Sequence, residues 1–114
     1  MLVRSYKDIA AMPYAEGVTK RVAIGSKEGA PNFVMRIFEL TPGVMPHYHS
    51  HDWEHEIFVL SGEGAVHTEQ GDVPLKANDV AFIPANEKHG LMGGKGPEPF
   101  RFICVVPLRG EDTK

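Results

Sequence analysis

Residues 42–62 read PGVMPHYHSHDWEHEIFVLSG, and four of the six histidines of the chain lie within nine residues of this stretch. Imidazole is a ligand for Mn, Fe, Ni, Cu and Zn, and histidines two residues apart on a strand point to the same face. His47 with His49, or His49 with His51, meets that spacing. A solvated histidine loop and an adventitious surface cluster are the alternatives. The pattern favours a buried metal centre.

Short apolar runs, separated by 12 Gly and 9 Pro, make up most of the chain. This pattern is typical of many strands joined by tight turns, and not of long amphipathic helices. The segments 61–64, 70–72 and 77–79 supply the Gly, Asn and Asp that such turns need. We expect strands at residues 21–24, 32–40, 45–49, 55–60, 65–69, 73–76, 80–83, 89–92 and 100–106. Nine short strands predict an all-β closed barrel or jelly roll.

The length of 114 residues and the hydrophobic content of 42% suit one domain over residues 1–114, with one active centre. We expect residues 109–114 to form a solvated tail. Cys104 is the only cysteine, so an intrachain disulfide cannot contribute to stability. The core must therefore suffice, together with a second subunit if one is present.

The formal charge of -3, with scattered Lys and Arg, provides no basic surface for a phosphate backbone or an anionic membrane. Nucleic acid and membrane are therefore not expected partners. Residues 1–17 lack the apolar core of a signal peptide, and nothing later approaches the roughly 20 apolar residues that span a bilayer. We expect a soluble cytoplasmic protein.

Two stretches of the sequence together resemble the cupin family. Residues 42–62 resemble the first cupin motif, in which His-x-His is followed by a third ligand and a glycine turn. Residues 78–93, NDVAFIPANEKHGLMG, resemble the second motif, in which a turn is followed by Pro and then His. Asn78, Asn86 and Gly93 replace the usual Gly, Gly and Asn, which affects turns more than chemistry. The resemblance implies a single cupin domain, a double-stranded β-helix of the jelly-roll type.

The third ligand position distinguishes this sequence from most cupins. In most cupins that ligand is a Glu, and six residues separate the Glu from the glycine of the turn. The residue at that spacing from Gly62 is His55, and Glu56 is one position out of register. Strand parity makes the choice exclusive, because if His55 faces the ion then Glu56 and Phe58 face away. The sequence thus resembles the cupin subgroup with an all-histidine centre, whose members are associated with manganese and sometimes with oxidative chemistry on unsaturated or aromatic substrates.

That resemblance assigns the metal ligands to His49, His51, His55 and His89. His47 shares a strand face with His49 but lies one step farther along, so we expect it at the mouth of the site or behind a ligand. His67, on a different hairpin, is expected at the surface.

Four neutral imidazoles leave the full +2 charge on a divalent ion, so the site should attract an anionic or chelating small molecule. A six-coordinate ion would retain two open positions. The resemblance implies Mn as the physiological ion, whereas the affinity order of imidazole sites favours Cu, Ni and Zn, and Fe is a further alternative.

Alternation along residues 100–106 places Phe102, Cys104 and Val106 on one strand face, which the resemblance turns inward. With Phe38, Ile57 and Leu91 they would line an apolar cavity, although plain core packing explains the same pattern. Cys104 is then either a thiol near the metal or a small buried hydrophobe. Arg36 either binds an anion in the pocket or extends to the surface.

The open all-histidine site and the shortage of proton-transfer groups favour a metal-dependent small-molecule oxygenase with dioxygenase-like chemistry on an unsaturated or aromatic substrate. The alternatives are a redox-neutral Lewis-acid isomerase or decarboxylase, and a non-enzymatic module that binds a metal and a small ligand. We also expect a homodimer, formed through an apolar outer sheet face and the N-terminal arm around residues 3–24.

Overall fold

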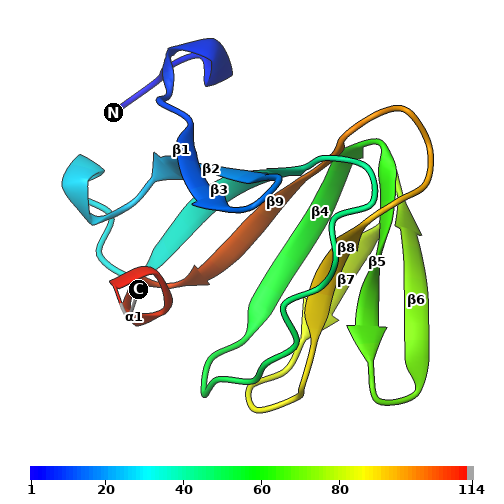
Figure 1. The fold of residues 1–114 in the computed structure, drawn as a ribbon. Coiled ribbons are helices and arrows are strands. Elements are labelled where there is room, and N and C mark those ends of the chain that lie inside the picture. The colour runs from blue at the N-terminus through cyan, green and yellow to red at the C-terminus, as the bar shows by residue number, and fades with distance from the viewer. Residues whose placement is uncertain (113–114) are drawn as a thin grey trace.

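The computed structural model describes residues 1–112, which form two antiparallel sheets facing one another (Figure 1). The larger sheet contains, in spatial order, β1 (Met12–Ala15), β2 (Val18–Ile24), β3 (Phe33–Leu40), β9 (Phe100–Pro107), β4 (His55–Ser61) and β7 (Val80–Ile83). The smaller sheet contains β6 (Gly71–Lys76), β5 (Glu63–Thr68) and β8 (Gly90–Gly93). The expected all-β architecture, a two-sheet jelly roll, is confirmed.

Three short helices complete the described chain: η1 (Tyr6–Asp8), η2 (Ser26–Glu28) and α1 (Leu108–Asp112). The first two are 3-10 turns in the N-terminal third, and α1 follows β9 directly. Within residues 1–112, every helix is too short or too polar to cross a membrane.

The core lies between the sheets and is built by strand alternation. Along β9, every second residue from Phe100 to Val106 is at most 3% exposed, while the residues between them are half-buried. Val34 of β3 and Val66 of β5 join the same apolar cluster from the two sheets. Fully burying a side chain of this size contributes about 1.5–3 kcal/mol, so the shared core stabilises the pairing of the two layers.

Turn positions explain the residues that depart from the usual motif. Asn78 and Asn86 have φ angles of 75° and 70°, in the left-handed region that Asn tolerates better than most residues. Gly62 also has positive φ, and a Cβ there would lie 2.1 Å from the carbonyl oxygen of Pro99. The glycine at 62 is therefore required by the close approach of two chain segments, whereas Asn serves at the other two turns.

Two strand predictions were wrong. Residues 45–49 form no strand; Pro46 has no N–H to donate, and the segment makes only a single bridge between His49 and His89. The strand β1 was not predicted, because its four residues are all exposed and include Pro13. It is held by pairing with β2, so its formation depends on a partner strand rather than on its own pattern.

The expected solvated tail is also corrected. Residues 109–112 belong to α1, in which Gly110 is buried and Glu111 forms ion pairs with Lys20 and Arg36. The polar composition of this segment predicts solvation, but the buried cations of β2 and β3 supply it with partners. Residues 113–114 of that prediction lie outside the described residues.

Candidate metal centre

Three histidines from two segments converge at one end of the sandwich. His49 and His51 lie on the loop between β3 and β4, and His89 directly precedes β8. The backbones of His49 and His89 exchange two hydrogen bonds, of 3.0 and 2.9 Å, which fasten the loop to the strand. One ring nitrogen from each of the three histidines lies within 4.8 Å of the others. The three side chains can therefore bind one ion.

The same three rings share one hydrogen-bonding pattern, in which Nδ1 lies close to a backbone carbonyl oxygen two residues away. The pairs are His49 with His47 (2.7 Å), His51 with Trp53 (2.9 Å) and His89 with Glu87 (2.8 Å). A carbonyl oxygen can only accept, so Nδ1 of each ring donates its proton and Nε2 keeps a free lone pair. This donor set fits a divalent metal ion.

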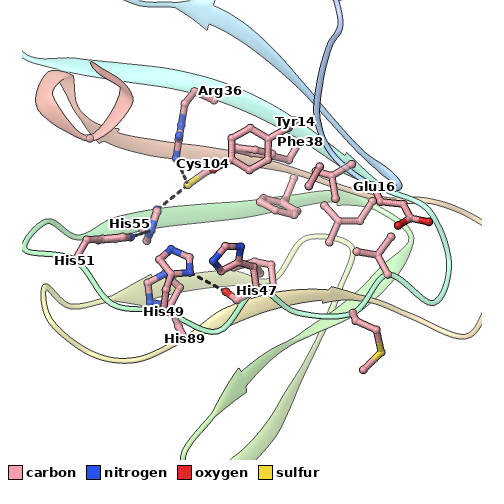
Figure 2. A pocket seen from close by; sticks show the side chains of 18 of the residues that line it. Tyr14, Glu16, Arg36, Phe38, His47, His49, His51, His55, His89 and Cys104 are labelled. Carbon is pink, nitrogen blue, oxygen red and sulfur yellow. Dashed lines mark hydrogen bonds between the residues drawn. The ribbon is translucent and has the colours of Figure 1, made fainter. Parts of the chain in front are cut away.

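His55, the first residue of β4, lies beside these three. Its ring centroid is 4.7 Å from that of His51 and 4.9 Å from that of His89, and its Nε2 is 2.9 Å from Nε2 of His51. Glu56 and Phe58 are exposed on the opposite face of the strand. The structure therefore brings all four histidines together (Figure 2), with three nitrogens converging and His55 adjacent to them.

Burial favours the neutral form of three of these rings. It lowers the pKa of His51 and of His89, and it lowers the pKa of His55 to about 3, with the neighbouring His89 and His51 adding to the shift. A metal ion binds only unprotonated imidazole, so these lowered pKa values favour metal binding at neutral pH.

A cavity of about 440 Å³ opens beside the histidines. Arg36, Phe38, Leu91, Phe102 and Cys104, all proposed from the sequence, line it, and the exposed His47 does so as well. Ile57 and Val106, which we also expected there, belong to the packed core, being 3% and 1% exposed. Their inward-facing space is filled by neighbouring core side chains, as close packing requires.

Sequence reasoning missed several cavity residues, and most of them have no local pattern that marks them. The far end of the cavity is formed partly by β1 and the turn after it, where Tyr14 and Glu16 line it (Figure 2). Trp53 also lines the cavity and was overlooked as part of the histidine segment. Trp53 is the only tryptophan in the chain and lies two residues from His51. This position beside a candidate ligand was the sequence feature that could have identified it.

Buried charge adjoins the cavity on the side of α1. Arg36 is 3% exposed, so it does not extend to the surface, and its guanidinium contacts Glu111 at 3.3 Å and Sγ of Cys104 at 3.2 Å. Lys20 is 5% exposed and pairs with the same carboxylate. Two buried cations thus share the Glu111 carboxylate, and the Arg36 guanidinium lies in the wall of the cavity.

His67 lies apart from this group. It is on β5, where Nδ1 is 2.6 Å from the Asp72 carboxylate and the ring contacts Tyr48.

Comparisons with known proteins agree with this fold. An oxalate-binding protein from Thermotoga maritima is 34% identical over 116 residues, covering 95% of this chain and 94% of that protein. The structure of the polyketide cyclase RemF from Streptomyces resistomycificus is 35% identical, with a TM-score of 0.83 over 95% of this chain and 80% of RemF. A predicted oxalate decarboxylase from Thermotoga maritima is 28% identical, with a TM-score of 0.78 over 95% and 99% of the two chains. The Cupin_2 family model, a cupin domain, matches residues 36–106, and the chain therefore belongs to the cupin family.

Proposed function

We propose that this protein is a metal-dependent enzyme that transforms a small, oxygen-chelating anion with an apolar or aromatic body by redox-neutral chemistry. The observation that carries the proposal is the convergence of neutral histidines on one end of an apolar cavity. The proposed ligands are His49, His51, His55 and His89. We propose manganese as the physiological ion, with Fe, Ni, Zn and Cu as ions that the same donors can hold.

A divalent ion held by neutral rings keeps its +2 charge and supplies a centre that stabilises negative charge on substrate oxygen atoms. The protein adds a positive group of its own, because the Arg36 guanidinium lines the cavity and is 3% exposed. Trp53 covers one face of the His51 ring and so limits water at that ligand. The site therefore favours anions over neutral molecules.

The size and walls of the cavity indicate how large the substrate is. Its volume of about 440 Å³ falls in the ~300–1,000 Å³ range of pockets that hold drug-sized ligands. The Phe38 ring is stacked on Phe102 at 5.5 Å and met edge-on by Tyr14 at 5.2 Å. A flat ring can stack on such a wall. The cavity suits a substrate larger than oxalate. Its size is closer to that of the polyketide substrate that the name polyketide cyclase implies for RemF.

Proton transfer within this cavity depends on few groups. Near the histidines, the Phe38 and Phe102 rings and the aliphatic side chains carry no acid or base. His47 is exposed, and its ring lies 5.0 Å from that of His49. We assign His47 the exchange of protons between substrate and water. Tyr14 and Glu16, at the far end, would contact the outer part of the substrate.

A metal-dependent oxygenase is the second candidate. The observation that favours it is the same scarcity of acids and bases near the histidines, because oxidation of an unsaturated substrate needs fewer of them than isomerisation or decarboxylation does. A non-enzymatic binding module is a third class, which the name of the oxalate-binding relative suggests.

One experiment separates the three classes. The metal-free protein is loaded with Mn²⁺ or Zn²⁺ and incubated, with and without oxygen, with oxalate, malonate, β-diketones and hydroxylated aromatic acids. Products are followed by mass spectrometry, and oxygen is followed by electrode. Turnover without oxygen under both metals is expected. Turnover only with oxygen and a redox-active metal would instead establish the oxygenase, and saturable binding without product would establish the binding module.

We propose that two copies associate through the outer face of β4 and β7. Phe58, Val80 and Phe82 are 41%, 72% and 62% exposed there, and Phe58 and Val80 are direct cross-strand partners. These side chains form one apolar patch, which monomeric proteins rarely leave uncovered. The N-terminal arm, which we expected to contribute, packs on its own sheet, where the Tyr6 ring lies 4.3 Å from the Arg21 guanidinium.

A further inference from the structure

Cys104 lies between the candidate ligand His55 and the buried Arg36. Its sulfur is 3.1 Å from Nδ1 of His55 and 3.2 Å from a terminal guanidinium nitrogen of Arg36 (Figure 2). Both Cys104 and Arg36 are 3% exposed, so water does not compete for these contacts. Glu111 of α1 holds the other end of the guanidinium, at 3.3 Å. A chain of contacts thus runs from α1 to His55.

The direction of the hydrogen bonds in the metal-free site follows from the acceptors. His51 donates from Nδ1 to the carbonyl oxygen of Trp53, so Nε2 of this neutral ring is a bare acceptor. Nε2 of His55, 2.9 Å away, must then carry the proton between the two rings. Nδ1 of His55 is left bare and accepts a hydrogen bond from the Cys104 thiol.

Metal binding requires the opposite arrangement at His55. The ring must present the Nε2 lone pair to the ion, so its proton must lie on Nδ1, and the partner of Nδ1 must then accept. A backbone carbonyl, as found behind the other three rings, accepts but cannot donate. A thiol does both. His55 therefore differs from its neighbours in having a partner suited to either ring tautomer.

We propose that Cys104 is the positioning residue for the fourth ligand, holding the His55 ring in both hydrogen-bonding directions so that it can join the other histidines when an ion enters. The ring releases the Nε2 proton to water and takes one from water at Nδ1, with no change in net charge. The thiol keeps its proton, which rotates away while the sulfur accepts. Arg36 donates to the sulfur in both states. This inference rests on the proposed four-histidine centre.

Variants at two inward positions of β9 test the proposal. Cys104→Ser keeps a side-chain group that both donates and accepts hydrogen bonds. Cys104→Ala and Cys104→Val remove that group; alanine leaves a smaller side chain, and valine replaces the thiol with an apolar branch. Val106→Ala is the matched control, because Val106 is buried on the same strand face and contributes to the core. His55→Gln reports the behaviour of a site without the fourth imidazole.

Co²⁺ and Zn²⁺ serve as probes. Co²⁺ affinity is measured by chelator competition and its coordination by visible absorption, and the ring tautomers are read by nitrogen-15 NMR of the metal-free and Zn²⁺ forms. We expect wild type, Cys104→Ser and Val106→Ala to share one spectrum and one affinity. We expect Cys104→Ala and Cys104→Val to bind about 10-fold or more weakly, with the spectrum of His55→Gln. The proton of His55 should move from Nε2 to Nδ1 on Zn²⁺ binding.

Three outcomes would overturn the inference. The first is wild-type affinity and spectrum in both Cys104→Ala and Cys104→Val. The second is a His55 proton that already lies on Nδ1 in the metal-free protein. The third is equal metal affinity in wild type and His55→Gln. That result would show that His55 is not a ligand, but it would leave a three-histidine enzyme possible. A wild-type protein that binds neither ion would instead refute the metal site and the proposed function together.

Discussion

The indole of Trp53 is stacked on the imidazole of His51, with ring centroids 4.2 Å apart and planes only 6° from parallel. The backbone carbonyl of the same Trp53 accepts the hydrogen bond from Nδ1 of His51. One residue thus sets both the plane and the tautomer of a candidate ligand. Because Trp53 packs against the core cluster, the ligand is tied to the fold as a whole.

Replacing Trp53 tests this relationship. Trp53→Ala should destabilise the protein by about 3 kcal/mol, at the low end for large-to-small changes because the ring is half-buried. It should also weaken metal binding by about tenfold through the freed His51 ring. Trp53→Phe preserves a flat ring and should retain most of the affinity. Urea denaturation and chelator competition measure the two effects. Equal affinity in all three proteins would show that the stack does not orient His51.

Gly110 of α1 is pressed against the same indole, and a Cβ there would lie 2.7 Å from Nε1 of Trp53. Alanine normally stabilises a helix relative to glycine by about 1 kcal/mol. Here the stacked ring cannot easily move, so Gly110→Ala should destabilise by about 1–3 kcal/mol. Gly96→Ala, which adds a methyl group to open space, is the control. Thermal unfolding compares them, and a stabilised Gly110→Ala protein would mean that α1 does not pack as described.

The stability of the metal-free protein should depend on pH through His55. Its pKa falls from the ordinary 6.5 to about 3 in the folded state, first because the ring is buried. The unfolded chain therefore binds the proton more readily, so this contribution to stability is complete above pH 6.5 and is lost as pH falls toward 3. Urea midpoints of metal-stripped protein at pH 7.5, 6 and 5 should decline. The decline should be shallower in His55→Gln, and parallel slopes would contradict the prediction.

Metal content should distinguish His89 from His67. His89 is 2% exposed and belongs to the converging set, whereas His67 is bound to Asp72 on β5. His89→Ala should reduce the bound metal from about one ion per chain to nearly none, because it removes a ligand and opens a buried space. His67→Ala should leave it unchanged. Elemental analysis after dialysis measures both, and equal metal content in the two variants would exclude His89 as a ligand.

The proposed dimer predicts an effect of charge on β7. Phe82→Lys places a cation in the apolar patch beside Glu56, its cross-strand partner, so the fold should persist while association weakens. Sedimentation velocity at micromolar concentration should show a shift from dimer toward monomer. Val73→Lys alters an exposed apolar residue of the smaller sheet and should not change sedimentation. Monomeric wild-type protein would refute the dimer.

Local patterns in the sequence were enough to predict much of the strand architecture. Period-two alternation placed His55 on the inward face of β4 and Glu56 on the outward face, and it identified the buried residues of β9. These inferences succeed because side-chain direction in a strand repeats every two residues, whatever the strand packs against. The family motifs then indicated that His89, far along the chain, belongs with the first histidines.

Only the tertiary structure decided how the site is enclosed. The pairing of β1 with β2 brings Tyr14 to the cavity, and the pairing of Lys20 with Glu111 joins residues 91 positions apart. The same long-range packing places Cys104 against His55 and α1 against Trp53. None of these contacts has a local signature, because each exists only once separate segments have packed together and excluded water. The sequence thus determined the histidines and their strand register, and the folded chain determined what surrounds them.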